Sequence, residues 1–281
     1  MKSEKITGPV IPLPTPFTSA GAVDYTALKN YVGFLAQKGI ACVMTTVGTS
    51  RFNLVTNDEV KRINEAVVEA GKGKLITIVA NPPVGSLEHA KEFARHSESI
   101  GADYFLAYFP ERYYGEENTF RFFNELNGCV KNTRILIHEM PMRNGLGAGQ
   151  VQYSLPLLEQ LLALSQVAGF KEEALDAEYS NKIVEKFNKT AIIIGAGGGM
   201  SRFLNRDHQR GAVAYLGGIG NFYPELELEF YAAIMGGNQT RASQIVNEIE
   251  IPYFNDVVPM GWHPSLKAAL ALKELLPPFE R

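Results

Sequence analysis

The feature that most constrains the fold is a regular alternation of short apolar runs and longer segments with helical periodicity. Such runs are typical of strands buried on both faces, as in parallel sheets. The expected strands are residues 10–15, 42–46, 75–80, 104–108, 135–138, 167–171, 191–194 and 212–216. The expected helices between them are residues 24–38, 57–71, 87–100, 119–130, 155–164, 177–187 and 200–204.

This alternation predicts an α/β fold, a closed (β/α)8 TIM barrel. The alternative is an open doubly wound sheet, but no G-x-G-x-x-G motif opens the first helix and no break in the alternation marks a switch point. After Asn221 the strand pattern ends, and helical segments follow at residues 224–235, 239–255 and 264–276. We therefore expect a barrel over residues 1–222 and a C-terminal helical extension over residues 223–281 that packs on it.

The charge and cysteine patterns argue against several classes of function. The formal charge is -3, with 27 Lys+Arg against 30 Asp+Glu and no basic stripe, so nucleic-acid binding is not expected. No apolar run approaches the roughly 20 residues of a membrane span, and no signal-peptide pattern is present, which predicts no membrane association and a cytoplasmic location. Cys42 and Cys129 lie in apolar or helical sequence without metal-site or disulfide spacing, so buried free thiols and no metal are expected.

Lys171 is the main candidate for chemistry, because it ends the apolar run of the sixth expected strand. The strands of a barrel end at a common mouth, where active sites lie. A lysine directed into such a site loses hydration, which lowers its pKa and makes its amine a nucleophile for a carbonyl carbon. The alternative is an ordinary surface lysine just past a strand.

Other strand ends contribute polar groups to the same mouth. Backbone amides and hydroxyls of Gly48, Thr49 and Ser50 can hold a carboxylate, and the eighth strand ends at Leu216 before two glycines. His138 ends the fifth strand and is a candidate proton carrier, with a buried core histidine as the alternative. The run 195–199 is glycine-rich, and it is either a tight turn into a helix or a phosphate site.

Several motifs, taken together and in order, resemble the dihydrodipicolinate synthase / N-acetylneuraminate lyase family of class I, Schiff-base aldolases and dehydratases. They are Pro14-Thr15-Pro16-Phe17, Gly101-Ala102-Asp103, Gly169-Phe170-Lys171-Glu172, Asn221 with Pro224-Glu225-Leu226, and Pro264 with Lys267-Ala268-Ala269. The resemblance covers the whole chain. It implies a barrel with a helical extension, a homodimer or homotetramer, and action on 2-keto acids such as pyruvate without a metal or organic cofactor.

The resemblance also implies roles for individual residues. Lys171 falls on the Schiff-base lysine, and Thr49 falls on the threonine linked to carboxylate binding. Gly48 replaces the threonine of the family's proton relay, and His138 replaces a relay tyrosine. Arg143 resembles the arginine that meets the carboxylate of a second substrate. Tyr113 and Tyr114 are candidates for a further relay tyrosine.

Three functions follow as hypotheses. The first is a lyase that acts on a 2-keto acid, pyruvate or a sugar-derived keto acid, through a Schiff base on Lys171, with His138 moving protons in aldol cleavage, condensation or dehydration. In this hypothesis Gly48, Thr49, Ser50, Arg143 and Leu216 bind the substrate. The second is a catalytically silent paralogue that binds a carboxylate or sugar acid, because two relay groups are changed. A third, unrelated barrel enzyme would use phosphate at residues 195–199.

Overall fold

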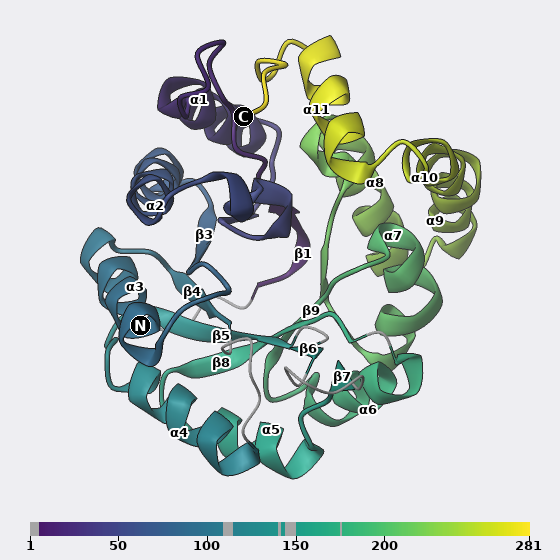
Figure 1. The fold of residues 1–281 in the computed structure, drawn as a ribbon. Helices are drawn as coiled ribbons and strands as arrows, with labels where there is room; N and C mark the ends of the chain where they lie inside the picture. The colour runs from purple at the N-terminus through teal and green to yellow at the C-terminus, as the bar shows by residue number, and fades with distance from the viewer. Residues whose placement is uncertain (1–5, 109–114, 140–141, 144–149, 175) are drawn as a thin grey trace.

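The structure is a computed structural model that describes residues 6–108, 115–139, 142–143, 150–174 and 176–281. Within these residues, eight parallel strands close into a barrel in the order β1-β10-β9-β8-β5-β4-β3-β2 (Figure 1). The strands are β1 (Gly8–Pro12), β2 (Cys42–Thr45), β3 (Ile76–Ala80), β4 (Tyr104–Ala107), β5 (Arg134–Glu139), β8 (Val167–Glu172), β9 (Ile192–Gly195) and β10 (Ala214–Leu216). The predicted closed (β/α)8 barrel is therefore confirmed.

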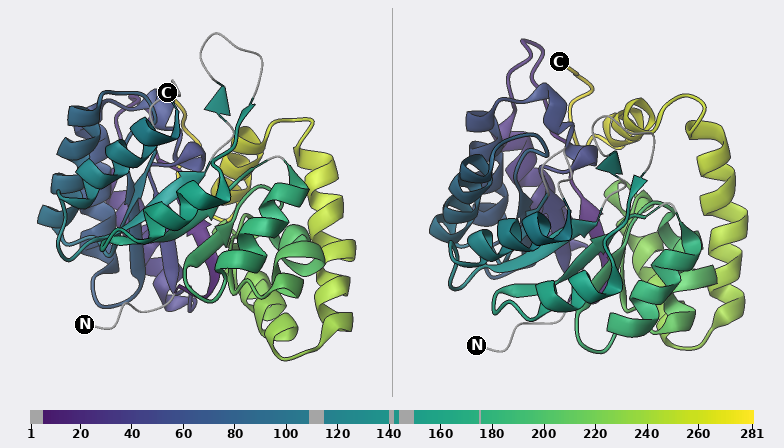
Figure 2. Two further views of the ribbon diagram at one scale, coloured as in Figure 1. Left: turned by 90° about the horizontal axis from the view of Figure 1, so that it is seen from below. Right: turned by 60° about the horizontal axis from the view of Figure 1, so that its bottom comes forward.

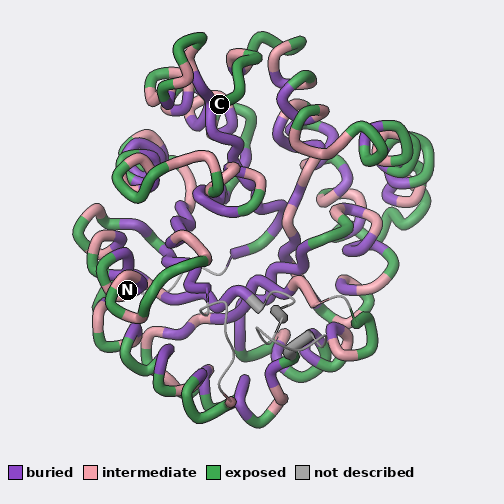
Figure 3. Tube along the Cα trace, in the orientation of Figure 1, coloured by how far each residue is buried: buried purple, intermediate pink, exposed green. Residues whose placement is uncertain are grey.

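Helices surround the barrel and cover its outer face (Figures 1 and 3). They are α1 (Tyr25–Gln37), α2 (Asn57–Gly71), α3 (Leu87–Ile100), α4 (Glu116–Asn127), α5 (Leu155–Leu162), α6 (Ala177–Phe187), α7 (Gly199–Arg202) and α8 (Pro224–Met235). The predicted cap at Asp24 is confirmed, because its carboxylate accepts from Ala27 N. The predicted cap of α2 at Asn57 is wrong: Thr56 is the cap and forms a capping box with Glu59.

The core has two layers of apolar side chains. The inner layer fills the barrel, with Val10, Met44, Ile78, Leu106, Leu136, Ile194 and Ala214 among its members. The outer layer lies between strands and helices. The backbones of β8 and β9 approach each other closely at Gly169, where an added Cβ would lie 1.9 Å from Ile192 O. Only glycine fits that position, since any side chain would separate β8 from β9.

The C-terminal helices α9 (Gln239–Ile245), α10 (Ile251–Val257) and α11 (Trp262–Leu272) follow α8 and extend beyond the barrel's own helices. Figure 2 shows α9 and α10 along one flank of the barrel. The single helix expected over residues 239–255 is interrupted by a π-helical turn at Val246–Glu250. There Glu250 accepts hydrogen bonds from Met200 N and Ser201 N, 2.7 and 2.6 Å away. These two hydrogen bonds connect the C-terminal extension to α7.

The structure adds features that the sequence analysis did not anticipate. The helix expected at 200–204 continues from α7 into a π-helical turn at Phe203–Asp207. A short antiparallel pair, β6 (Met142–Arg143) with β7 (Gln150–Val151), lies outside the barrel. Both cysteines are free, and Cys42 is buried as expected. The expectation that Cys129 is buried is wrong, because its side chain is partly exposed. Among the residues that were placed, no helix is long and apolar enough to cross a membrane.

Candidate active site

A cavity of about 420 Å³ includes Lys171 and other residues at the carboxyl ends of the barrel strands. Lys171 is only 3% exposed, so the alternative of an ordinary surface lysine is wrong. Burial lowers the pKa of the Lys171 ammonium below its ordinary value, although the negative charge of Glu173 opposes that shift. A buried amine with a lowered pKa is neutral more often than a surface lysine, and a neutral amine can attack a carbonyl carbon.

His138 is brought to Lys171 by the strand register. The two residues are paired across the neighbouring parallel strands β5 and β8, and both line the cavity. Their Nε2 and Nζ atoms are 2.8 Å apart. Burial first, and the charge of Lys171 second, lower the pKa of His138 to about 4, so its imidazole is neutral at neutral pH. The ring of Tyr108 packs on this imidazole with centroids 4.7 Å apart, which fixes its orientation.

Glu173 is the third member of the cluster, and the sequence analysis missed it. Its Oε2 atom contacts Lys171 Nζ and lies 2.7 Å from His138 Nε2. Burial would raise the pKa of Glu173, but the Lys171 ammonium and the contact with His138 outweigh it and hold the pKa well below its ordinary value. A signal was available in the sequence, because side chains two apart on a strand point to the same face.

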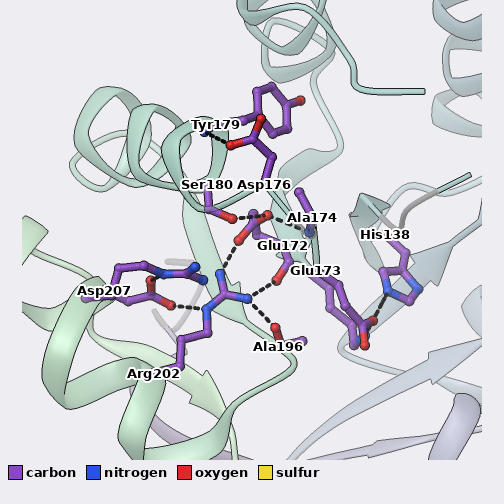
Figure 4. Close-up of polar contacts among 12 residues, drawn as sticks. His138, Glu172, Glu173, Ala174, Asp176, Tyr179, Ser180, Ala196, Arg202 and Asp207 are labelled. Atoms are coloured by element: carbon purple, nitrogen blue, oxygen red, sulfur yellow. Dashed lines mark hydrogen bonds and ion pairs between the residues drawn. The ribbon is translucent and has the colours of Figure 1, made fainter. Parts of the chain in front are cut away.

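Glu172 points to the opposite side of β8 and belongs to a second buried network (Figure 4). Its carboxylate contacts Arg202 and accepts from Ser180 Oγ at 2.8 Å. Arg202 also binds Asp207, with Nε 2.7 Å from Oδ2, and donates to the carbonyl oxygen of Ala196. Arg202 Nη1 also donates to the backbone carbonyl oxygen of Glu172, at 3.3 Å. The network thereby fixes the end of β8, which carries Lys171.

The turn Gly48–Ser50 forms another wall of the cavity, and its residues divide into two groups. Gly48 and Thr49 line the cavity, as does Leu216 at the end of β10. Ser50 does not: its hydroxyl donates to Leu13 O at 2.6 Å, and its carbonyl accepts from Thr15 Oγ1 at 2.5 Å. The structure therefore brings Gly48, Thr49 and Leu216 to Lys171, whereas Ser50 anchors the turn to the segment after β1.

The glycine run is a turn rather than a phosphate site. Gly197, Gly198 and Gly199 have φ values of 75, 136 and 51°, which favour glycine. The amides of Met200 and Ser201, which begin the following helix, already donate to the carboxylate of Glu250. A phosphate would have to displace that carboxylate, so the tight-turn interpretation is correct.

The C-terminal extension forms a further wall of the cavity and contacts the turn Gly48–Ser50. Phe254, Trp262 and His263 line the cavity, and His263 Nε2 lies 3.0 Å from Gly48 O. Sequence reasoning missed these residues, and no local pattern marks them, because the contact spans most of the chain. Phe52 and Tyr108 were also missed. Tyr108 is the last residue of an expected strand, so the strand-end rule applied to His138 would have found it.

The structure does not describe the side chains of three predicted site residues. Tyr113 and Tyr114 lie outside the described residues. Arg143 lies in β6, and its side chain lies outside what the structure describes. Among the residues that are described, no group of three or more His, Cys, Asp or Glu side chains is arranged to hold a metal ion.

The fold and the buried amine define a class: a (β/α)8 barrel protein with a lysine inside the carboxyl end of its sixth barrel strand. Residues 5–277 match the sequence profile of the Dihydrodipicolinate synthetase family. The chain belongs to this family, which is one of lyases. The resemblance found in the sequence is thus confirmed.

Individual relatives are distant but cover most of the chain. The chain is 26% identical to a 4-hydroxy-tetrahydrodipicolinate synthase of Methanopyrus kandleri, over 87% of this chain and 79% of that protein. It is 25% identical to a probable 5-dehydro-4-deoxyglucarate dehydratase of Bacillus licheniformis, over 84% of this chain and 74% of that protein.

Solved structures share the fold. An N-acetylneuraminate lyase from Mycoplasma synoviae superposes with a TM-score of 0.83 at 22% identity, covering 100% of this chain and 94% of that one. A dihydrodipicolinate synthase from Aquifex aeolicus gives a TM-score of 0.84 at 21% identity, covering 98% of this chain and 91% of that one.

Proposed function

We propose that the protein is a lyase that forms a Schiff base between Lys171 and a 2-keto acid, either pyruvate or a sugar-derived keto acid. The observation that carries this proposal is the Nζ atom of Lys171, which is buried, lines the cavity and lies 2.8 Å from His138 Nε2. Nucleophile and proton carrier are thus within hydrogen-bond reach of each other.

The carboxylate of the substrate has a matching site on the turn Gly48–Ser50. The Thr49 hydroxyl and the amides of Gly48 and Thr49 are the groups we assign to it. The amides of Ser50 and Arg51 already donate to Val47 O and Gly48 O, at 2.9 and 3.0 Å. Arg143 and Tyr113 or Tyr114 stay proposed contacts for the rest of the substrate.

The reaction follows from the imine. Once Lys171 has attacked the keto carbon and water has left, the protonated imine nitrogen draws electrons from the neighbouring carbon and stabilises a carbanion there. From this state the bond to the next carbon can break as a carbonyl forms there, a hydroxyl on that carbon can leave as water, or the carbanion can attack the carbonyl carbon of a second substrate. Each of these reactions requires a proton transfer to or from oxygen. Neutral His138 is placed to accept a proton, because its Nε2 atom is directed at Lys171.

Borohydride trapping tests the proposal. The protein is incubated with each of a panel of 2-keto acids, reduced with sodium borohydride and digested. The mass of the peptide that contains Lys171 is then measured by mass spectrometry. We expect a mass increase equal to the reduced adduct, and none in Lys171→Met. An unmodified Lys171 across the whole panel would overturn the proposal.

A second candidate is a silent paralogue that binds a carboxylate or sugar acid. Gly48 and His138 favour it, since both stand at positions where the resemblance implies relay groups, and each proton transfer is typically worth about 10²–10⁴-fold in rate. Thermal stabilisation by a keto acid, without product and equally strong in Lys171→Met, would support this candidate. Covalent labelling of Lys171 with turnover would exclude it.

A further inference from the structure

Glu173 lies on the same face of the strand end as Lys171, with Glu172 on the opposite face. We propose that Glu173 is a catalytic residue that carries protons during formation and breakdown of the imine on Lys171. This inference rests on the proposed function. It assigns proton transfer to Glu173 in a site where Gly48 and His138 replace the threonine and tyrosine of the family's proton relay.

The position of Glu173 suits a proton carrier. A single oxygen, Oε2, contacts both the Lys171 amine and His138 Nε2, so a proton can pass among the three without a change of side-chain conformation. The Glu173 side chain is 34% exposed, whereas the side chains of His138 and Lys171 are 3% and 4% exposed. Glu173 also lines the cavity. It is therefore the member of the cluster that can exchange protons with substrate and solvent.

The charge of Lys171 controls when Glu173 takes up a proton. While Lys171 is an ammonium, its charge keeps the carboxylate ionised. When the nitrogen becomes neutral, that stabilisation disappears, and burial then raises the proton affinity of the carboxylate. Neutral His138, held by the ring of Tyr108, lies against Oε2 of Glu173 and adds no competing positive charge.

The steps balance as follows. The Lys171 ammonium transfers a proton to the Glu173 carboxylate, and the free amine forms a bond to the keto carbon. The carbonyl electron pair moves to oxygen, which takes the proton from Glu173. The carboxylate then removes a proton from the nitrogen and delivers it to the hydroxyl group, which leaves as water while the nitrogen lone pair forms the protonated imine. Glu173 ends as a carboxylate, as it began.

Other charged groups near Lys171 enter any interpretation of pH dependence. Glu172 and Arg202 act on the amine from the opposite side of β8, and Glu173 and His138 face it in the cavity. The negative charges of Glu173 and Glu172 raise the pKa of Lys171, and Arg202 lowers it. A variant that removes only the charge of Glu173 leaves the Glu172–Arg202 pair in place, so its effect on the pH midpoint can be assigned.

The test compares the rate of borohydride trapping of pyruvate in wild type, Glu173→Gln and the control Glu178→Gln. Glu178 lies on α6 with its side chain 79% exposed. We expect the trapping rate of Glu173→Gln at optimal pH to fall about 100-fold or more. Its pH midpoint should move to lower pH, because the amine has lost an anionic neighbour. Glu178→Gln should match wild type in both respects.

Chemical rescue separates a proton carrier from a structural contact. We expect added formate to restore trapping in Glu173→Ala in a concentration-dependent manner, while chloride at equal ionic strength does not. Melting temperatures identify any variant that fails to fold, in which case Glu173→Asp, with slowed but measurable trapping, replaces it. Wild-type rates in Glu173→Gln, or no rescue in folded Glu173→Ala, would overturn this inference alone. Wild type that is never labelled would instead overturn the proposed function.

Discussion

His138 Nε2 lies 2.8 Å from Lys171 Nζ although the two residues are 33 positions apart in the chain. The parallel register of β5 and β8 places them side by side, and both side chains enter the barrel. The charge of Lys171 adds to burial in lowering the pKa of His138.

This pair predicts a specific pH dependence. The folded pKa of His138 is about 4, below its unfolded value, so the unfolded state binds the proton first as pH falls. The stability that neutral His138 contributes is therefore complete above about pH 6.5 and is lost as pH falls toward about 4. Between pH 6.5 and pH 4.5, the melting temperature of wild type should fall further than that of His138→Gln. Equal losses would show that His138 titrates normally.

In the turn Gly48–Ser50, removing the hydroxyl of Thr49 and removing that of Ser50 should have different effects. Thr49→Val should raise the pyruvate concentration for half-maximal borohydride trapping about 10-fold, because a hydrogen bond to a charged group is worth roughly 1.5–3 kcal/mol. Ser50→Ala should leave that concentration unchanged and lower the free energy of unfolding by about 1–3 kcal/mol, because Leu13 O loses its donor. Equal effects of both variants on trapping would contradict the assignment of Thr49.

Two glycines predict opposite effects of the same substitution. Gly169→Ala should destabilise the protein by about 3 kcal/mol or more, since its Cβ would collide with Ile192 O and separate β8 from β9. Gly33→Ala in α1 meets nothing within 4 Å and should stabilise by about 0.5–1 kcal/mol. Urea unfolding monitored by circular dichroism measures both. A tolerated Gly169→Ala would mean that the two strands lie further apart.

We expect the titration of Glu250 to lower the stability of the protein at alkaline pH. Burial first, and the neighbouring Glu227 second, raise its pKa to about 8 in spite of hydrogen bonds from Met200 N and Ser201 N. The folded state therefore holds a proton that the unfolded state releases near pH 4.3, so stability falls as pH rises toward about 8. Glu250→Gln should flatten the change of melting temperature between pH 5.5 and pH 8.5. An unchanged slope would place the titration elsewhere, with Glu227 as the next candidate.

The barrel and Lys171 were predictable because both depend on local signals. Buried strands need continuous apolar runs, and a charged residue that ends such a run marks the barrel mouth. Glu173 could also have been predicted, because it is two residues after Lys171 and side chains two apart on a strand point to the same face. It was missed because it directly follows another glutamate, Glu172. Trp262 and His263 were not predictable, since their place in the cavity depends on how α11 packs near the start of the chain. Neither was the π-helical turn at Val246–Glu250, which depends on a contact with α7.

The pairing of β1 with both β2 and β10 bears on biosynthesis. The edge of β1 that faces β10 has no partner until β10, the last strand of the barrel, has been synthesised. The turn Gly48–Ser50 likewise lacks its contact with His263 until α11 emerges. Lys171 consequently lies in a complete cavity only after β10 and α11 have been synthesised and have packed on the barrel.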